Sequence, residues 1–231
     1  MRDDCTGMSK KGRLIKKNAV LDNLLERYPL LCECRDSIEN AYLKLEQVYR
    51  DGGRLYIAGN GGSAADSGHI AGELVKSFMI NRPVDDRTII EYEKRFGTDG
   101  RNLGENLQGG LPAMPLSALT TVITAVTNDM DGQYIFSQSL NAFAGKGDAF
   151  LGLSTSGNSP DIINAFMVAT VKKMIRIGLT GKQICKMDSL CDVVIHVPET
   201  ETYKVQELHM PVYHALCAML ELRFFSSEQE K

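Results

Sequence analysis

The sequence predicts an α/β protein with a five-stranded parallel sheet and helices on both faces. Five short apolar runs alternate along the chain with longer stretches whose apolar residues recur at helical spacing. Runs that are apolar throughout are typical of parallel strands, which helices cover on both faces. A length of 231 residues with 43% hydrophobic content suits one such domain, so we expect residues 1–231 to form a single domain.

A helical prefix over residues 1–52 precedes the first strand. Its apolar residues recur at helical spacing between residues 14 and 49, which predicts two helices. Pro29 marks their junction because proline cannot donate a backbone hydrogen bond inside a helix. The apolar faces of this prefix pack either on the chain's own core or on another copy of the chain, and the sequence leaves both open.

The first strand leads into the glycine-rich run Gly59-Asn60-Gly61-Gly62-Ser63 and then into a helix that we expect to end near Phe78. Glycines permit positive φ and a close approach of the backbone to a ligand, and a helix start offers unpaired N–H groups to an anion. His69 and Glu73 share one face of this helix at i, i+4 spacing. One element therefore combines a binding loop with groups able to do chemistry.

Residues 84–110 have a different character, with many charged residues and interspersed glycines. We expect an insertion at the surface with one or two short helices. A polar segment of this length inside a compact domain is either functional or mobile. A lid over the site is the functional hypothesis, and a mobile surface loop is the alternative.

The rest of the chain resumes the alternation of strands and helices. The expected strands are 116–119, 149–153, 175–180 and 192–197, and the expected helices are 121–126, 134–143, a short stretch at 184–190, and 203–225. Pro211 lies inside the last pattern and predicts a kink there or the true start of that helix.

A hydroxyl-rich run, Ser154-Thr155-Ser156-Gly157-Asn158-Ser159, follows the strand predicted at 149–153. Pro160 after Ser159 fits an N-cap followed by proline at the first helical position. Hydroxyls, backbone N–H groups and the helix dipole together hold a phosphate dianion without a lysine; the alternative is an ordinary capped turn. Both loops follow strands and so lie at the carboxyl edge of the sheet, where ligands of such folds bind.

Several classes of protein are disfavoured. A net charge of −3 gives no reason to expect nucleic acid or an anionic membrane as partner. The N-terminal residues lack the apolar core of a secretory signal, and no apolar run would span a bilayer, so a cytoplasmic address is the default. The glycine run lacks the acidic residue of a dinucleotide site and the lysine of a P-loop, so no nucleotide cofactor is expected.

Four motifs in this order, at residues 59–63, 154–159, 179–182 and 206–209 with His214, resemble the sugar isomerase (SIS) family, and within it the phosphoheptose isomerases. The similarity covers about residues 14–225, except the insertion at 84–110. The resemblance implies a flavodoxin-like SIS fold, a sugar phosphate substrate, and a homo-oligomer, a homotetramer with active sites between subunits.

The resemblance also assigns site residues. Glu73 is the general base and His214 its acid/base partner. The phosphate is bound by Ser154, Thr155, Ser156 and Ser159, and the rest of the substrate by Asn60, Gly61, Ser63, Asp129 and Gln206. Members of the family also bind zinc, through positions that match His69, Glu73, Gln206 and His214.

The implied reaction interconverts sedoheptulose 7-phosphate and glycero-manno-heptose 7-phosphate through an enediol. A carboxylate and a histidine suffice for it as base and acid. A zinc ion that polarises the carbonyl is a competing scheme for the same residues, and the sequence does not choose. Gln206 and His214 lie about 12 Å apart on a straight helix, so one ion needs a distorted helix or ligands from two subunits. The alternative function is a non-catalytic SIS module that binds a sugar phosphate or a protein, like the replication-initiation partner of this family.

Overall fold

The computed structural model describes residues 15–226, and its five strands form one parallel sheet in the order β2-β1-β3-β4-β5. The strands are β1 (Leu55–Gly59), β2 (Ala113–Pro115), β3 (Ala149–Leu153), β4 (Ile175–Thr180) and β5 (Val193–His196). This order is that of flavodoxin-like folds, whose ligands bind where the strand order reverses, between β1 and β3. The predicted fold class is confirmed.

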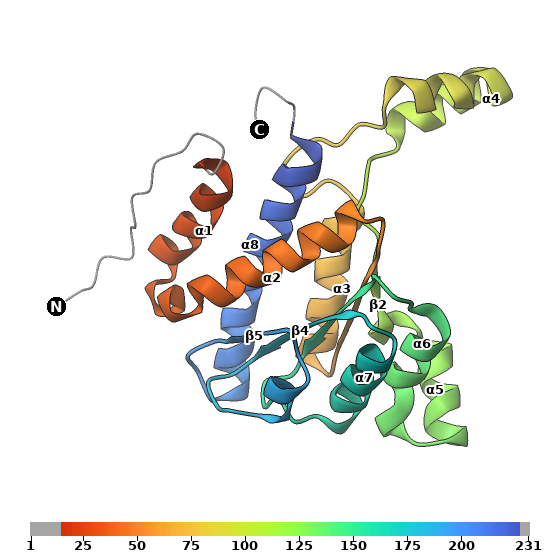
Figure 1. The fold of residues 1–231 in the computed structure, drawn as a ribbon. Coiled ribbons are helices and arrows are strands. Elements are labelled where there is room, and N and C mark those ends of the chain that lie inside the picture. Colours follow the sequence, from red (N-terminus) through yellow and green to blue (C-terminus); the bar gives the residue numbers. More distant parts are fainter. Residues whose placement is uncertain (1–14, 227–231) are drawn as a thin grey trace.

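Helices cover both faces of the sheet (Figure 1). One face carries α2 (Arg35–Arg50), α3 (Gly62–Val75) and α8 (Thr202–Phe225), with α1 (Ile15–Arg27) packed on α8; the other carries α6 (Ile135–Phe143) and α7 (Pro160–Val171), with α5 (Thr120–Asp129) beside α6. Each face of the sheet packs a hydrophobic core against its helices, because successive side chains of a strand point to opposite faces. In β1, Leu55 and Ile57 belong to the core on the α2, α3 and α8 side, while Tyr56 and Ala58 belong to the core on the α6 and α7 side.

The N-terminal prefix contains the two predicted helices, α1 and α2, joined by the 3₁₀ helix η1 (Pro29–Cys34), which begins at the predicted junction. Buried side chains such as Leu21, Leu31 and Ile38 pack this prefix into the core of its own chain. The part of the predicted prefix before residue 15 lies outside the described residues.

Two predicted elements differ from the structure in their bounds. The strand predicted at 116–119 is wrong, because the strand is Ala113–Pro115 and the 3₁₀ helix η2 (Leu116–Ala118) follows it. Pro115 cannot donate to the ladder, so the strand ends there. Helix α3 ends at Val75, earlier than the predicted end near Phe78. Helix α8 agrees with the predicted 203–225 and continues through Pro211, which therefore does not mark its start.

The insertion forms α4 (Asp86–Asn106), a helical arm that projects from the body near the C-terminal end of α8 (Figure 1). The Asp85 side chain caps its start by accepting from the Thr88 N–H at 3.0 Å. Gly97 takes φ +62° and breaks the helix into two segments, and Gly100 lets them pack, since a Cβ there would lie 2.1 Å from the Tyr92 carbonyl oxygen. The predicted helical insertion is confirmed; its role as a lid stays a prediction.

Two further 3₁₀ helices, η3 (Gly132–Tyr134) and η4 (Lys186–Ser189), complete the described elements. Among the helices of residues 15–226, none has the length and apolar character needed to cross a bilayer. No disulfide joins the cysteines at the described positions.

Candidate active site

The glycine-rich loop turns directly from β1 into α3 at the carboxyl edge of the sheet. Gly61 is exposed and takes φ +54°, a backbone conformation that residues with a side chain rarely adopt. Asn60 is also exposed, and its amide nitrogen donates to both carboxylate oxygens of Asp161 on α7, at 2.8 and 3.1 Å. Asp161, which the sequence analysis did not indicate, thus holds the Asn60 side chain with its carbonyl oxygen directed away from the Asp161 carboxylate. Ser63 is buried at the start of α3.

The hydroxyl-rich loop connects β3, the strand next to β1, to α7. The Ser154 and Ser159 hydroxyl oxygens are 2.9 Å apart, while Ser156 is exposed. Ser159 holds the N-cap position, but its side chain does not cap the helix. The Asp161 carboxylate instead accepts from the Ile162 N–H at 3.0 Å. The Ile162 N–H in the first turn of α7 is therefore already paired, and the hydroxyls of the loop stay the predicted ligands of a phosphate.

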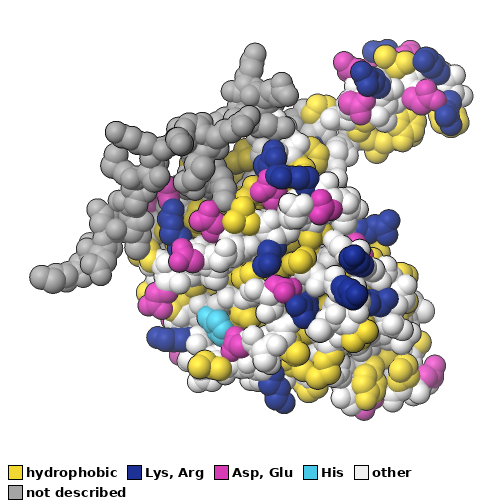
Figure 2. Space-filling model, viewed as in Figure 1, with side chains coloured by type: hydrophobic (Ala, Val, Ile, Leu, Met, Phe, Trp, Pro, Cys, Tyr) yellow, Lys and Arg dark blue, Asp and Glu magenta, His cyan; other side chains and the backbone are white. Residues whose placement is uncertain are grey.

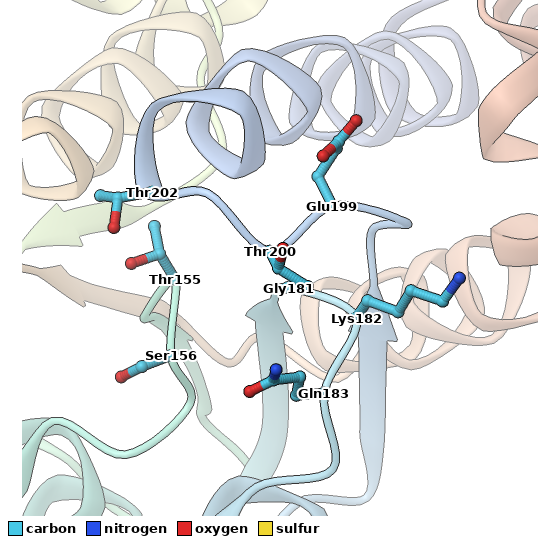
Figure 3. Close-up of a pocket in the computed structure, with 8 residues that line it drawn as sticks. All are labelled: Thr155, Ser156, Gly181, Lys182, Gln183, Glu199, Thr200 and Thr202. Atoms are coloured by element: carbon cyan, nitrogen blue, oxygen red, sulfur yellow. The ribbon is translucent and has the colours of Figure 1, made fainter.

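A cavity of about 100 Å³ opens beside this loop, at the carboxyl ends of β3 and β4 (Figure 3). Its lining residues are Thr155, Ser156, Gly181, Lys182, Gln183, Glu199, Thr200 and Thr202. The Gly181 N–H donates to the Thr155 carbonyl at 3.2 Å, which holds the two loops together. Figure 3 shows the Lys182 ammonium extending to the side away from Thr155 and Ser156.

A second cluster forms where α3 lies against α8. His69 Nε2 is 3.1 Å from Glu73 Oε1 and 3.4 Å from His214 Nε2. The helical spacing of His69 and Glu73 produces the first contact, and the packing of α8 produces the second. Burial, and then the neighbouring His69, lower the pKa of His214, which favours a neutral imidazole. The two predicted acid/base groups are therefore brought together around His69 within one chain.

Two residues that the sequence did not indicate support this cluster. The buried Tyr213 hydroxyl donates to Asp66 Oδ1 at 3.1 Å and lies 3.1 Å from His69 Nδ1. Burial, followed by the nearby Asp66 carboxylate, raises the pKa of Tyr213 far above its ordinary value, so the hydroxyl keeps its proton. The only signals in the sequence are positional, since Asp66 precedes His69 by three residues and Tyr213 adjoins His214.

Gln206, the fourth predicted zinc ligand, lies apart from the other three. Its amide packs on the start of α3, where a Cβ on Gly62 would lie 2.7 Å from Gln206 Nε2. His214 lies two turns further along α8, about 12 Å away by helical rise. Within residues 15–226, no group of three or more His, Cys, Asp or Glu side chains is arranged to hold a metal ion. One chain thus does not assemble the four-ligand site, and Gln206 lies instead beside the glycine-rich loop.

Asp129, the remaining predicted contact, is exposed at the C-terminal end of α5. Its carboxylate accepts from the Asn128 side chain at 2.7 Å. Helix α5 packs beside α6, on the sheet face opposite to α3 and α8. Neither loop nor the histidine cluster makes a hydrogen bond to Asp129 in the described part of the chain.

A buried ion pair fixes the C-terminal end of α3. Arg82 Nε donates to Glu221 Oε1 at 2.7 Å, and neither side chain has exposed surface. The Arg82 guanidinium also donates to the carbonyl oxygens of Leu74 and Glu73, at 2.8 and 2.9 Å, and so caps the C-terminus of α3. The backbone of Glu73 is therefore tied to α8 through this pair.

The fold and its two loops define an α/β protein of the SIS type. No protein-family model matches the sequence. The chain is 39% identical over 191 residues to the phosphoheptose isomerase of Aneurinibacillus thermoaerophilus, covering 83% of each chain, and 37% identical over 188 residues to phosphoheptose isomerase 2 of Campylobacter jejuni, covering 81% of each. The structure of the phosphoheptose isomerase GmhA from Neisseria gonorrhoeae superposes with a TM-score of 0.67 at 27% identity, covering 89% of this chain and 98% of that one.

This chain belongs to the phosphoheptose isomerase family, a family of enzymes. The resemblance found in the sequence motifs is confirmed, and the non-catalytic alternative is not favoured.

Proposed function

We propose that this enzyme isomerises sedoheptulose 7-phosphate to glycero-manno-heptose 7-phosphate. The observation that carries the proposal is the cluster of Glu73, His69 and His214, in which a carboxylate and two imidazoles meet at 3.1 and 3.4 Å. It occurs in a member of the phosphoheptose isomerase family, beside loops suited to a sugar phosphate. A module that only binds its ligand has no chemical need for such a set of groups.

The reaction moves one proton between carbons and one between oxygens. Glu73 removes a proton from C1 of the ketose, which gives an enediol, and returns it at C2. His214 moves the proton that leaves O1 and the proton that O2 gains, a task for which a neutral imidazole with a lowered pKa is suited. The C1–H and O1–H bonds are the ones broken, and the C2–H and O2–H bonds are the ones formed.

The loops hold the substrate in this proposal. Ser154, Thr155, Ser156 and Ser159 bind the phosphate, which the contact between Ser154 and Ser159 and the exposed Ser156 support. Asn60, Gly61, Ser63 and Gln206 contact the sugar, which the packing of Gln206 on Gly62 supports. Asp129 stays a predicted contact without support of this kind.

Zinc binding stays a prediction. His69, Glu73 and His214 meet in one chain, but the set that includes Gln206 requires a ligand from a second copy. Metal analysis of purified protein tests this, alongside Gln206→Ala and His69→Gln. Metal content lost only in His69→Gln would show a site without Gln206.

We also propose that the enzyme is a homo-oligomer, and specifically a homotetramer. The α4 arm supports this, because Ile90, Phe96 and Leu103 on the helix and Leu107 directly after it are 40–64% exposed. Figure 2 shows hydrophobic surface on the lower side of the arm, next to charged side chains. Sedimentation of Phe96→Asp should show smaller assemblies than wild type, with Thr98→Asp as the polar control on the same arm. An unchanged mass for Phe96→Asp would remove the arm from the interface.

Hydrogen exchange at the substrate carbons tests the activity itself. Sedoheptulose 7-phosphate is incubated with enzyme in deuterated water, and NMR follows deuterium at C1 and C2. We expect incorporation with wild type, a rate lower by about 10²–10⁴-fold for Glu73→Gln, and no change for the exposed arm residue Glu91→Gln. Wild-type protein that binds the sugar phosphate without exchange would establish the non-catalytic alternative.

A further inference from the structure

Two hydrogen bonds from the segment after β4 anchor the hydroxyl-rich loop of residues 154–159. The Gly181 N–H donates to the Thr155 carbonyl at 3.2 Å, and the Lys186 N–H donates to the side-chain oxygen of Asn158 at 3.0 Å. Thr155 and Gly181 line the same cavity (Figure 3). The position of the loop therefore depends on what holds these two N–H groups in place.

Asp188 holds the second anchor. Its Oδ2 accepts from the Cys185 N–H at 2.7 Å, which fixes the turn at the start of η4 that presents the Lys186 N–H to Asn158. The same turn touches the loop directly, because Gly157 takes φ +65° and a Cβ there would lie 2.1 Å from Cys185 Sγ. A displacement of this turn would thus displace the middle of the loop.

His196 on β5 joins the second anchor to the first. Its Nε2 lies 2.7 Å from Asp188 Oδ1, and its Nδ1 lies 2.8 Å from the Gly181 carbonyl oxygen. A carboxylate and a carbonyl only accept hydrogen bonds, so the ring makes both bonds with a proton on each nitrogen. Burial opposes the charge of Asp188, but the Cys185 N–H and then His196 outweigh it and lower the pKa of this carboxyl. The ionised pair therefore ties the two anchors to each other.

We infer that Asp188 and His196 are positioning residues, which hold the two anchors of the hydroxyl-rich loop and so fix the hydroxyls that it offers to a phosphate. The inference rests on the proposed function for the role of the loop. Neither residue belongs to the proposed acid/base cluster, so loss of the pair should weaken binding of the sugar phosphate and leave the chemical step unaffected.

Steady-state kinetics of Asp188→Asn test this difference. Asparagine keeps the shape of the side chain, but its nitrogen cannot accept, so the bond to Cys185 or the bond to His196 is lost. We expect KM for sedoheptulose 7-phosphate to rise about five- to tenfold while kcat stays within about twofold. His196→Leu removes both ring donors and should raise KM at least as much.

Asp192→Asn is the matched control. Asp192 pairs with Arg176 at the amino ends of β4 and β5, and these side chains are 25% and 23% exposed, close to the 29% and 30% of Asp188 and His196. The substitution breaks a comparable ion pair away from the loop, so KM and kcat should both stay unchanged. A KM that rises equally in both variants would reflect a general loss of stability and would overturn the inference.

A double-variant cycle with Asn158→Ala tests the route. Asn158→Ala removes the acceptor of the second anchor, so Asp188 then has less of the loop left to hold. The rise in KM of the double variant should be well below the product of the two single rises. A rise equal to that product would mean that Asp188 does not act through this anchor.

Amide hydrogen exchange of the full chain without substrate reads the loop itself. We expect exchange at residues 154–159 to quicken about five- to tenfold in Asp188→Asn and to stay unchanged in Asp192→Asn. Exchange in Asp188→Asn equal to that of wild type overturns the inference even in an active isomerase.

Binding of inorganic phosphate, measured by calorimetry, separates the inference from the proposed function. If wild type does not isomerise the sugar phosphate, phosphate binding that weakens in Asp188→Asn but not in Asp192→Asn supports the positioning role and rejects the isomerase proposal. A wild type that binds no phosphate, or equal binding in wild type and Asp188→Asn, overturns the inference.

Discussion

Replacing Glu221 by glutamine tests the buried ion pair that joins α3 to α8. The Glu221 carboxylate accepts from the backbone N–H groups of Phe78, Met79 and Ile80, at 2.8, 2.7 and 3.3 Å, and from Arg82 Nε at 2.7 Å. Neither charged side chain has exposed surface. Glutamine has nearly the same shape, so the substitution removes the charge and one acceptor oxygen without opening a cavity.

The expected loss of stability follows from the unpaired groups. The side-chain NH₂ group introduced by Glu221→Gln would face backbone N–H groups that need an acceptor. The Arg82 guanidinium would also stay buried without an opposite charge. Breaking one side of a buried pair costs about 3–5 kcal/mol. A chain of this length changes its melting temperature by about 2–4 °C per kcal/mol, so Tm should fall by about 6–20 °C.

Thermal and urea unfolding at one fixed protein concentration measure this loss, since assembly changes apparent stability. The control is Glu91→Gln, which breaks an ion pair with Arg95 whose side chains are 53% and 68% exposed. That change should cost less than about 1 kcal/mol. If Glu221→Gln costs no more than the control, the ion pair does not stabilise the fold as argued. The double variant Arg82→Met with Glu221→Gln should regain part of the loss, because no buried charge is then left unpaired and the amide oxygen still accepts from the backbone N–H groups.

Three further predictions concern the loops and a buried histidine. Ser159→Ala should raise KM for the sugar phosphate about tenfold with little change in kcat, by loss of one hydroxyl contact of about 1.4 kcal/mol, whereas Ser189→Ala should change neither. Burial lowers the pKa of the His209 imidazole from 6.5 to about 4, so as the pH falls the unfolded chain takes up this proton before the folded chain does. The free energy of unfolding should therefore be highest above about pH 6.5 and fall by about 3 kcal/mol toward pH 4. Urea titrations of His209→Leu should not show this loss. Gly157→Ala forces a side chain into φ +65°, with its Cβ 2.1 Å from a neighbouring thiol, and should cost at least about 1–3 kcal/mol in urea unfolding, whereas Gly68→Ala, in a helix with open space, should be neutral or stabilising.

The strands and both loops were predictable because their signals are local. Apolar runs, the glycines after β1 and the hydroxyls before Pro160 each act within a few residues, and the rule for parallel sheets then places the two loops at one edge. The error at Leu116 has the same origin. An apolar run predicts burial, but Pro115 ends the hydrogen bonding to β1, which apolar periodicity does not register.

The contacts that hold the site were not predictable, because they join distant parts of the chain. Tyr213 and Asp66 are separated by 147 residues, and Glu221 and Arg82 by 139. Such pairs depend on the position of α8 along α3, and a shift of α8 by one turn would separate both pairs. Helical spacing alone indicated that Gln206 and His214 lie too far apart for one small ion, and the position of Gln206 beside Gly62 agrees with that spacing.

The same pairs explain why the proposed catalytic groups face each other. Glu73 lies on the last turns of α3 and His214 on α8, and no covalent link near them fixes the separation of the two helices. Tyr213 joins the helices on one side of the cluster, and Arg82 joins them on the other by binding both Glu221 and the carbonyl of Glu73 itself. Because these contacts bracket the cluster, loss of the ion pair in Glu221→Gln should lower kcat more than it raises KM, in addition to its effect on stability. An unchanged kcat in a protein whose Tm has fallen would show that Tyr213 alone is sufficient to keep the helices in register.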